Sequence, residues 1–267
     1  MKKFFKLPWK AILTAVATII AFDIGGNAIF QYPIVGIIFL ILGFVLFVIL
    51  YHLRNAFLNT YLLYRHHCEP HEGLIMLVST PSFAPQKSGE YWKVKNGSTE
   101  VTLTGDLEND INNLEEAKNM NPPLRWNWQQ LLRALSPHAK SLKVIYIIGS
   151  PEPNGSYKWL KEAKDIINSY IINANIEIYE NPIEFEDFEN LLESINDCIE
   201  NLREKGIKDK DILIDITGGQ KTASVVGAIA TLGARVTFQY VETTPDPLTG
   251  KYRIWAYDVA VQSPISI

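Results

Sequence analysis

The fold of this chain is decided by residues 212–224, which read Ile-Leu-Ile-Asp-Ile-Thr-Gly-Gly-Gln-Lys-Thr-Ala-Ser. The apolar run 212–216 is typical of a strand that is buried on both faces of a parallel sheet. The two glycines allow a tight turn and a close approach of the backbone to another group. An apolar helical pattern begins near Val225, so the stretch predicts a strand, a turn and a helix in direct succession.

The turn also has the residue types of an anion site. The first turn of a helix has N–H groups without a partner inside the helix, and these favour a negative charge. A lysine and several hydroxyls surround the glycines. The predicted phosphate-binding residues are therefore Thr217, Gly218, Gly219, Gln220, Lys221 and Thr222. Taken alone, an ordinary strand–helix turn with a solvated lysine is the alternative.

The turn is not a Walker P-loop. That motif requires Gly-x-x-x-x-Gly-Lys-Ser/Thr, whereas here Gln220 separates the last glycine from Lys221, and Asp215 or a neighbour occupies the place of the leading glycine. The loop is too short to wrap a triphosphate. We therefore expect an anion site without the machinery of an NTPase.

The remaining soluble part predicts a Rossmann-like α/β fold with a mostly parallel sheet. Apolar strands alternate with amphipathic helices, which implies right-handed crossovers. The insertion 82–116 departs from this scheme and contains a hairpin signature at Asn96-Gly97. A second hairpin is expected near the C-terminus, at 239–242 and 252–259. The further strands are expected at 74–79, 144–148, 176–179 and 236–241, and the helices at 125–135, 156–172, 184–204 and 220–232.

Ligands of such folds bind at the carboxyl ends of the strands. The strand at 74–79 ends in Ser79 and Thr80, and the strand at 144–148 is followed by Ser150. We therefore add these three hydroxyl residues to the candidate ligand-binding set, with Ser150 as the weakest member.

Composition excludes several classes of function. Residues 71–267 carry 19 Lys/Arg and 27 Asp/Glu, a net charge of −8, which disfavours binding to long nucleic acid. The two cysteines, Cys68 and Cys198, are far apart and indicate a reducing compartment. The run His66-His67-Cys68 is interpreted as a polar turn, because three adjacent side chains cannot converge on one tetrahedral ion. We expect no metal and no cofactor.

The N-terminal region predicts a two-helix transmembrane hairpin, formed by residues 7–22 and 34–53. No small-residue cleavage site follows the first segment, so a signal peptide is the weaker alternative. Lys/Arg residues flank the pair but are missing from the turn, which places both termini in the cytoplasm. The expected division is a hairpin at 1–53, a stalk at 54–71 and a ligand-binding domain at 72–267. Asp23 is expected in the outer turn, with a polar ring in an oligomeric pore as the alternative.

The string Asp-Ile-Thr-Gly-Gly-Gln-Lys at 215–221 resembles the signature of the CARF domain, the Rossmann-like sensor of CRISPR systems. The resemblance covers most of 72–267, and the insertion 82–116 has no counterpart in it. It implies a homodimer that binds a cyclic oligoadenylate, with cyclic tetra-adenylate favoured, across the dimer cleft. It also implies that residues 217–221, Ser79, Thr80 and Ser150 contact this ligand.

By the same resemblance, the chain is similar to the transmembrane CARF effectors of type III CRISPR antiviral defence. We therefore expect a non-enzymatic homo-oligomer, a dimer or tetramer, that perturbs the lipid bilayer of a prokaryotic plasma membrane when the ligand binds. One alternative is a membrane-tethered ring nuclease, in which Lys221 stabilises the developing charge. Another is a SAVED-like sensor of cyclic nucleotides.

Overall fold

The computed structural model describes residues 32–57, 60–219, 221–232, 235–242, 244–246 and 252–262. The chain divides into two compact units, one with Met1–Leu62 and Val261–Ile267, and the other with Leu63–Ala260. The first unit contains helix α2 (Pro33–Phe57). Pro33 suits the first position of this helix, because its fixed φ is already helical and its missing N–H would have no partner there.

The predicted transmembrane hairpin is wrong. Among the residues that the structure describes, no helix has both the length and the apolar character needed to cross a membrane. The described part of the predicted hairpin is α2, which continues beyond the apolar run 34–50 to include the charged residue Arg54. The other predicted segment, 7–22, and the candidate pore residue Asp23 lie outside the described residues.

The segment after α2 also differs from expectation. The predicted stalk at 54–71 contains the last turn of α2, which ends at Phe57, and strand β1 (Thr60–His67). β-Branched and aromatic residues favour a strand, and β10 (Ile254–Gln262) supplies the neighbouring strand.

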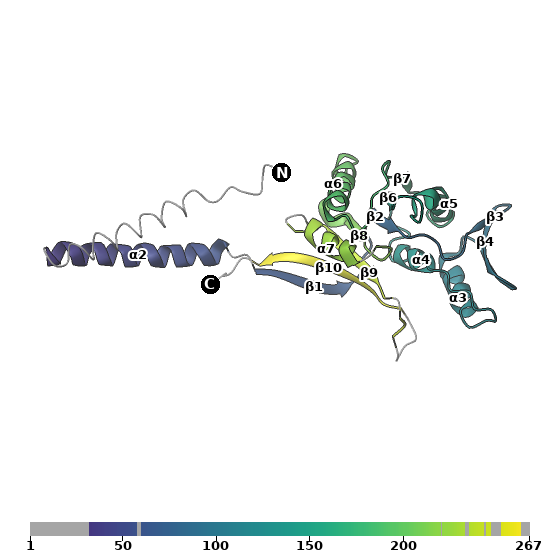
Figure 1. Cartoon of the computed structure of the whole chain (residues 1–267), viewed down its shortest axis with the longest axis horizontal. Helices are drawn as coiled ribbons and strands as arrows, with labels where there is room; N and C mark the ends of the chain where they lie inside the picture. Colours follow the sequence, from purple (N-terminus) through teal and green to yellow (C-terminus); the bar gives the residue numbers. More distant parts are fainter. Residues whose placement is uncertain are drawn as a thin grey trace. The chain divides into compact units, whose positions relative to one another are not determined.

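A seven-stranded sheet forms the centre of the second unit, and it confirms the predicted α/β fold (Figure 1). Its order is β1-β10-β9-β8-β2-β6-β7. The five strands from β9 to β7 are parallel to their neighbours, and β10 is antiparallel to β9, as the predicted C-terminal hairpin requires. The parallel strands are β2 (Gly73–Val78), β6 (Val144–Gly149), β7 (Asn175–Ile178), β8 (Ile212–Asp215) and β9 (Thr237–Val241).

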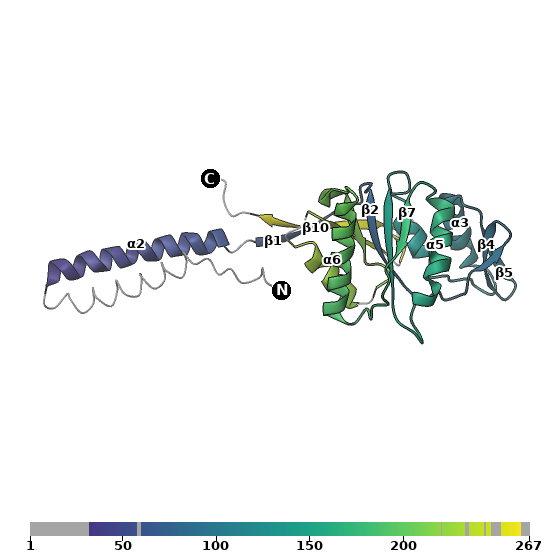
Figure 2. The same cartoon turned by 90° about the horizontal axis from the view of Figure 1, so that it is seen from above.

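Helices cover both faces of this sheet, and Figure 2 shows α6 and α5 on opposite sides of β2 and β7. Alternate residues of β2 enter two separate cores: Leu74 packs with α3–α5, and Ile75 packs with α6 and α7. Burial on both faces explains why the sequence of β2 is apolar without alternation. The helices are α3 (Leu107–Ala117), α4 (Gln129–Leu135), α5 (Leu160–Tyr170), α6 (Phe188–Glu204) and α7 (Lys221–Ala230). Two 3-10 turns, η1 (Tyr157–Trp159) and η2 (Asp209–Asp211), precede α5 and β8.

The insertion folds into a small antiparallel sheet of β3 (Gln86–Ser88), β4 (Tyr91–Asn96) and β5 (Thr99–Leu103). The predicted hairpin is confirmed, and Gly97 in its turn has φ of +56°. The buried Asp110 of α3 connects this sheet to the main domain. Its carboxylate accepts hydrogen bonds from the backbone of Thr104 at 2.7 Å and from the Tyr170 hydroxyl at 2.9 Å.

The order of the strands defines the place of a ligand crevice. The chain leaves β2 toward β6 on one side, and it later returns to β8 on the other side of β2. In open α/β sheets, ligands bind at such a switch point, beyond the carboxyl ends of the strands. The crevice therefore lies between the loops that follow β2 and β8.

Candidate ligand-binding site

The turn between β8 and α7 is packed against the end of β2. A Cβ atom on Gly218 would lie 1.8 Å from the carbonyl oxygen of Leu77, and one on Gly219 would lie 2.3 Å from the Cβ atom of Ala223. Neither separation is possible between real atoms, so both positions require glycine. The predicted turn thus lies at the switch point. Gln220 lies outside the described residues.

The N–H groups of Thr217 and Gly219 in the turn point to acceptors within the turn itself, whereas those of the first turn of α7 do not have acceptors inside the helix. Gly219 N–H donates to the carbonyl of Ile216 at 3.1 Å, and Thr217 N–H lies 3.4 Å from an Asp215 carboxylate oxygen. The first-turn N–H groups of α7, which begins at Lys221, have no partner inside the helix. Lys221 is exposed and Thr222 is half-buried beside them. The start of α7 therefore offers the donors of an anion site.

The hydroxyl residues after β2 and β6 lie at the same edge of the sheet. Thr80 Oγ1 donates to the carbonyl of Asn154 at 2.9 Å, which joins the two loops. Ser150 Oγ accepts from Ser156 N–H at 3.1 Å and stabilises its own loop. Ser79 Oγ accepts from Asn127 Nδ2 at 3.1 Å, which leaves its proton to donate. Of the three predicted residues, Ser79 is therefore the one whose hydroxyl is best placed to bind a ligand.

Asp215, the last residue of β8, stabilises the turn through a hydrogen bond with Thr217. Its side chain is only 1% exposed, and its Oδ1 accepts from the Thr217 hydroxyl at 2.6 Å. The Thr217 hydroxyl in turn accepts from Val241 N–H at 3.0 Å. Burial raises the pKa of Asp215 from 3.8 to about 7, although hydrogen bonds from Thr217 and Gln239 act in the opposite direction. The side chain is thus a structural support for the turn.

A buried hydrogen-bond network continues from Asp215 through Gln239, which lies opposite it on β9. Gln239 Nε2 donates to the carbonyl of Ala134 in α4 at 3.1 Å. Gln239 Oε1 lies 3.2 Å from Cys68 Sγ and 3.0 Å from His138 Nε2. An amide oxygen has two lone pairs, so it accepts both of these hydrogen bonds.

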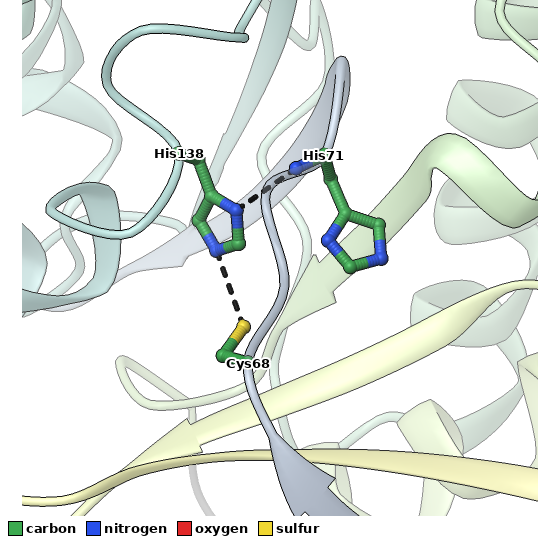
Figure 3. Close-up of side chains that lie close together, drawn as sticks. All are labelled: Cys68, His71 and His138. Carbon is green, nitrogen blue, oxygen red and sulfur yellow. Dashed lines mark hydrogen bonds between the residues drawn. The ribbon is translucent and has the colours of Figure 1, made fainter.

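The cluster of Cys68, His71 and His138 has the composition of a metal site, and its three ligand atoms lie within 4.8 Å of one another (Figure 3). The hydrogen bonds do not suit a metal. His138 Nδ1 lies 3.1 Å from the backbone N–H of His71, so Nδ1 is the acceptor and Nε2 carries the proton. A metal bound to Nε2 would instead require a protonated Nδ1 that faces an acceptor.

The second histidine and the thiol also take part in hydrogen bonds within the protein. His71 Nδ1 lies 2.6 Å from the carbonyl oxygen of Glu69, so this nitrogen carries a proton and donates. Burial raises the pKa of Cys68 to about 12 and lowers the pKa of His138 to about 4. Both groups are therefore neutral at pH 7, and in this protonation state Cys68 and His138 belong to the hydrogen-bond network around Gln239.

Sequence reasoning missed Asn127 and Gln239. Asn127 Nδ2 donates to Ser79 Oγ and to the carbonyl of Thr80 at 2.8 Å, and it thereby fixes the loop after β2. The sequence carries no signal for this role, because the residue lies within a stretch that has the pattern of a helix. Gln239 gives a weak signal, as a polar residue inside an otherwise buried strand.

No protein-family model matches the chain. A 121-residue stretch is 32% identical to an uncharacterized protein of Aquifex aeolicus (strain VF5). The matched stretch covers 45% of this chain and 39% of that protein, so the chain spans well under two thirds of this relative's length. Fold and site together define an α/β protein with a glycine turn and the start of helix α7 at its topological switch point.

Proposed function

We propose that this chain is a sensor that binds a small cyclic oligoadenylate, with cyclic tetra-adenylate as the first candidate, at the turn between β8 and α7. The observation that carries the proposal is the glycine turn packed onto β2, because it brings the start of α7 and Lys221 to the crevice of the sheet. A helix N-terminus with an adjacent cation is suited to phosphate groups. The resemblance of residues 215–221 to the CARF signature names the ligand class and associates it with type III CRISPR signalling.

The charge of the domain supports a small ligand. Residues 71–267 have a net charge of −8, which repels a long polyanion but allows a ring of a few phosphates held by local donors. Binding without cleavage is favoured, because Asp215, the one carboxylate within residues 215–222, is buried and accepts from Thr217. Asp215 thus has a structural role in holding the turn.

A homodimer fits this ligand. Helix α7 exposes Val225 and Ile229, which lie four residues apart on one side of the helix, and the turn that follows it exposes Leu232. A two-fold pair of chains would present two copies of the turn to a ring with two-fold symmetry.

The test is an equilibrium titration of the full-length protein with cyclic tetra-adenylate. The Lys221→Ala variant should bind about 10- to 100-fold more weakly, because a charge-assisted hydrogen bond contributes roughly 1.5–3 kcal/mol. Lys161→Ala, which removes an exposed lysine on α5, is the matched control and should bind as the wild type does. Equal affinity of the Lys221→Ala variant and the wild type would contradict the site. Chromatography of the recovered ligand shows whether it is intact, and its turnover would contradict a purely binding role.

A further inference from the structure

A small cavity adjoins the turn on the side of α4. It has a volume of about 170 Å³ and lies between the ends of β2 and β8 and the start of α4. This volume corresponds to about six water molecules at roughly 30 Å³ each, so it can hold one functional group or one ring but not a nucleotide. Its polar lining residues are Ser79, Asn127, Trp128, Gln130, Asp215 and Thr217.

Most hydrogen-bond donors of this lining already have partners. Trp128 Nε1 donates to the carbonyl of Ser79 at 2.6 Å. Asn127 Nδ2 donates to Ser79 Oγ and to the carbonyl of Thr80. The Thr217 hydroxyl donates to Asp215. These donors stabilise the loops and are not available to an anion inside the cavity.

An acceptor, by contrast, has no partner. Gln130 Oε1 is buried and makes no hydrogen bond within the described part of the chain. A buried amide oxygen without a donor is unfavourable, so a group that supplies an N–H or O–H would be stabilised there. Asp215 adds a second oxygen-bearing group to the same lining. A phosphate would meet these acceptors unfavourably.

We propose that this cavity receives a neutral hydrogen-bond donor of the nucleotide, which binds Gln130 Oε1 while the phosphates stay at the start of α7. In an oligoadenylate this donor is either the exocyclic amine of an adenine or a ribose 2′-hydroxyl. The inference rests on the proposed function, and it assigns to Gln130 the discrimination between nucleotides rather than the binding of phosphate.

The experiment compares three rings on the full-length protein by calorimetry: cyclic tetra-adenylate, its inosine analogue without the amine, and its 2′-deoxy analogue without the hydroxyl. If the amine enters the cavity, the wild type binds the inosine ring about tenfold more weakly. If the hydroxyl enters, the 2′-deoxy ring loses about the same factor. In either case the Gln130→Met variant, which keeps the side-chain length but lacks the acceptor, should bind cyclic tetra-adenylate and the analogue with equal affinity. The control is Gln86→Met on the exposed strand β3, which should keep the difference in affinity that the wild type shows.

The outcomes separate this inference from the proposed function. If the wild type binds all three rings equally, or if Gln130→Met keeps the wild-type discrimination, the inference is wrong, and weaker binding by Lys221→Ala would still support the phosphate site. If the wild type binds none of the rings, both proposals are overturned.

Discussion

At the scale of single residues, Asp215 and His138 belong to one buried network and respond to pH in opposite directions. Burial raises the pKa of Asp215 to about 7 and lowers that of His138 to about 4. Asp215 therefore contributes stability at low pH that is lost as the pH rises from about 4 to 7. His138 contributes stability above about pH 6.5 that is lost as the pH falls toward 4. Each effect is worth roughly 3–5 kcal/mol at about 1.4 kcal/mol per pH unit.

Because these two slopes oppose each other, we expect the unfolding free energy of the wild type to change little between pH 4.5 and 6.5. Asp215→Asn removes the contribution of the carboxyl group and keeps that of His138. The unfolding free energy of this variant should therefore rise with pH across this interval. His138→Asn should show the reverse slope. Urea unfolding at several pH values measures the unfolding free energy of all three proteins. If it changes with pH in the same way for the wild type and for Asp215→Asn, then Asp215 does not contribute to the pH dependence as proposed. Carboxylates with lowered pKa values, such as Glu115 and Asp209, lose their contribution mainly below this interval.

Single residues also differ in how far their roles could be predicted from the sequence. The turn at 217–222 could be predicted because its glycines, hydroxyls and lysine are contiguous. Gln130 and Gln239 could not be predicted, because their roles depend on residues brought close by the fold. Gln239, for example, meets Cys68 across 171 positions of sequence.

At the scale of elements, the turn between β8 and α7 acts as a rigid connector. We expect Gly218→Ala to move the turn away from β2, because its Cβ atom would overlap the carbonyl oxygen of Leu77. The variant should lose roughly 2–4 kcal/mol of unfolding free energy, as overpacking and backbone displacement typically cost, and should bind cyclic tetra-adenylate more weakly. Ser224→Ala, an exposed substitution on α7, is the control. Chemical denaturation and the same titration give both readouts, and a wild-type unfolding midpoint for Gly218→Ala would contradict the packing argument.

The strands β2, β6 and β8 could be predicted from their apolar runs alone, because such runs are typical of strands that are buried on both faces. β3 was missed because its three residues, Gln86–Ser88, are all exposed and polar or charged. The predicted start of α4 was four residues early. Trp126 Nε1 donates to the carbonyl of Phe83, and Asn127 binds the loop after β2, so the helix begins only at Gln129.

At the scale of the whole molecule, the exposed apolar residues of α7 predict self-association. Val225 is 54% exposed and lies one turn after Lys221, the residue proposed to bind phosphate. We expect Val225→Asp to shift the protein from a dimer toward a monomer of 30.2 kDa, because a buried unpaired carboxylate is strongly unfavourable in an apolar interface. Light scattering coupled to size-exclusion chromatography measures the mass. Ile172→Asp replaces a more exposed residue, 85% accessible, outside α7 and should not alter the mass. A Val225→Asp protein that keeps the wild-type mass would exclude this face as the interface.

The hydrogen-bond network around Gln239 has a consequence for the order of folding. Its contacts join residues that are 67 to 171 positions apart in sequence. Closing loops of such length costs chain entropy that no single hydrogen bond returns. The network therefore forms only after β2, β8 and β9 have assembled and α4 has docked, late on the folding pathway. Since Asp215 supports the turn from within this network, we expect the turn between β8 and α7 to reach its final geometry in the same late step, after the sheet has formed.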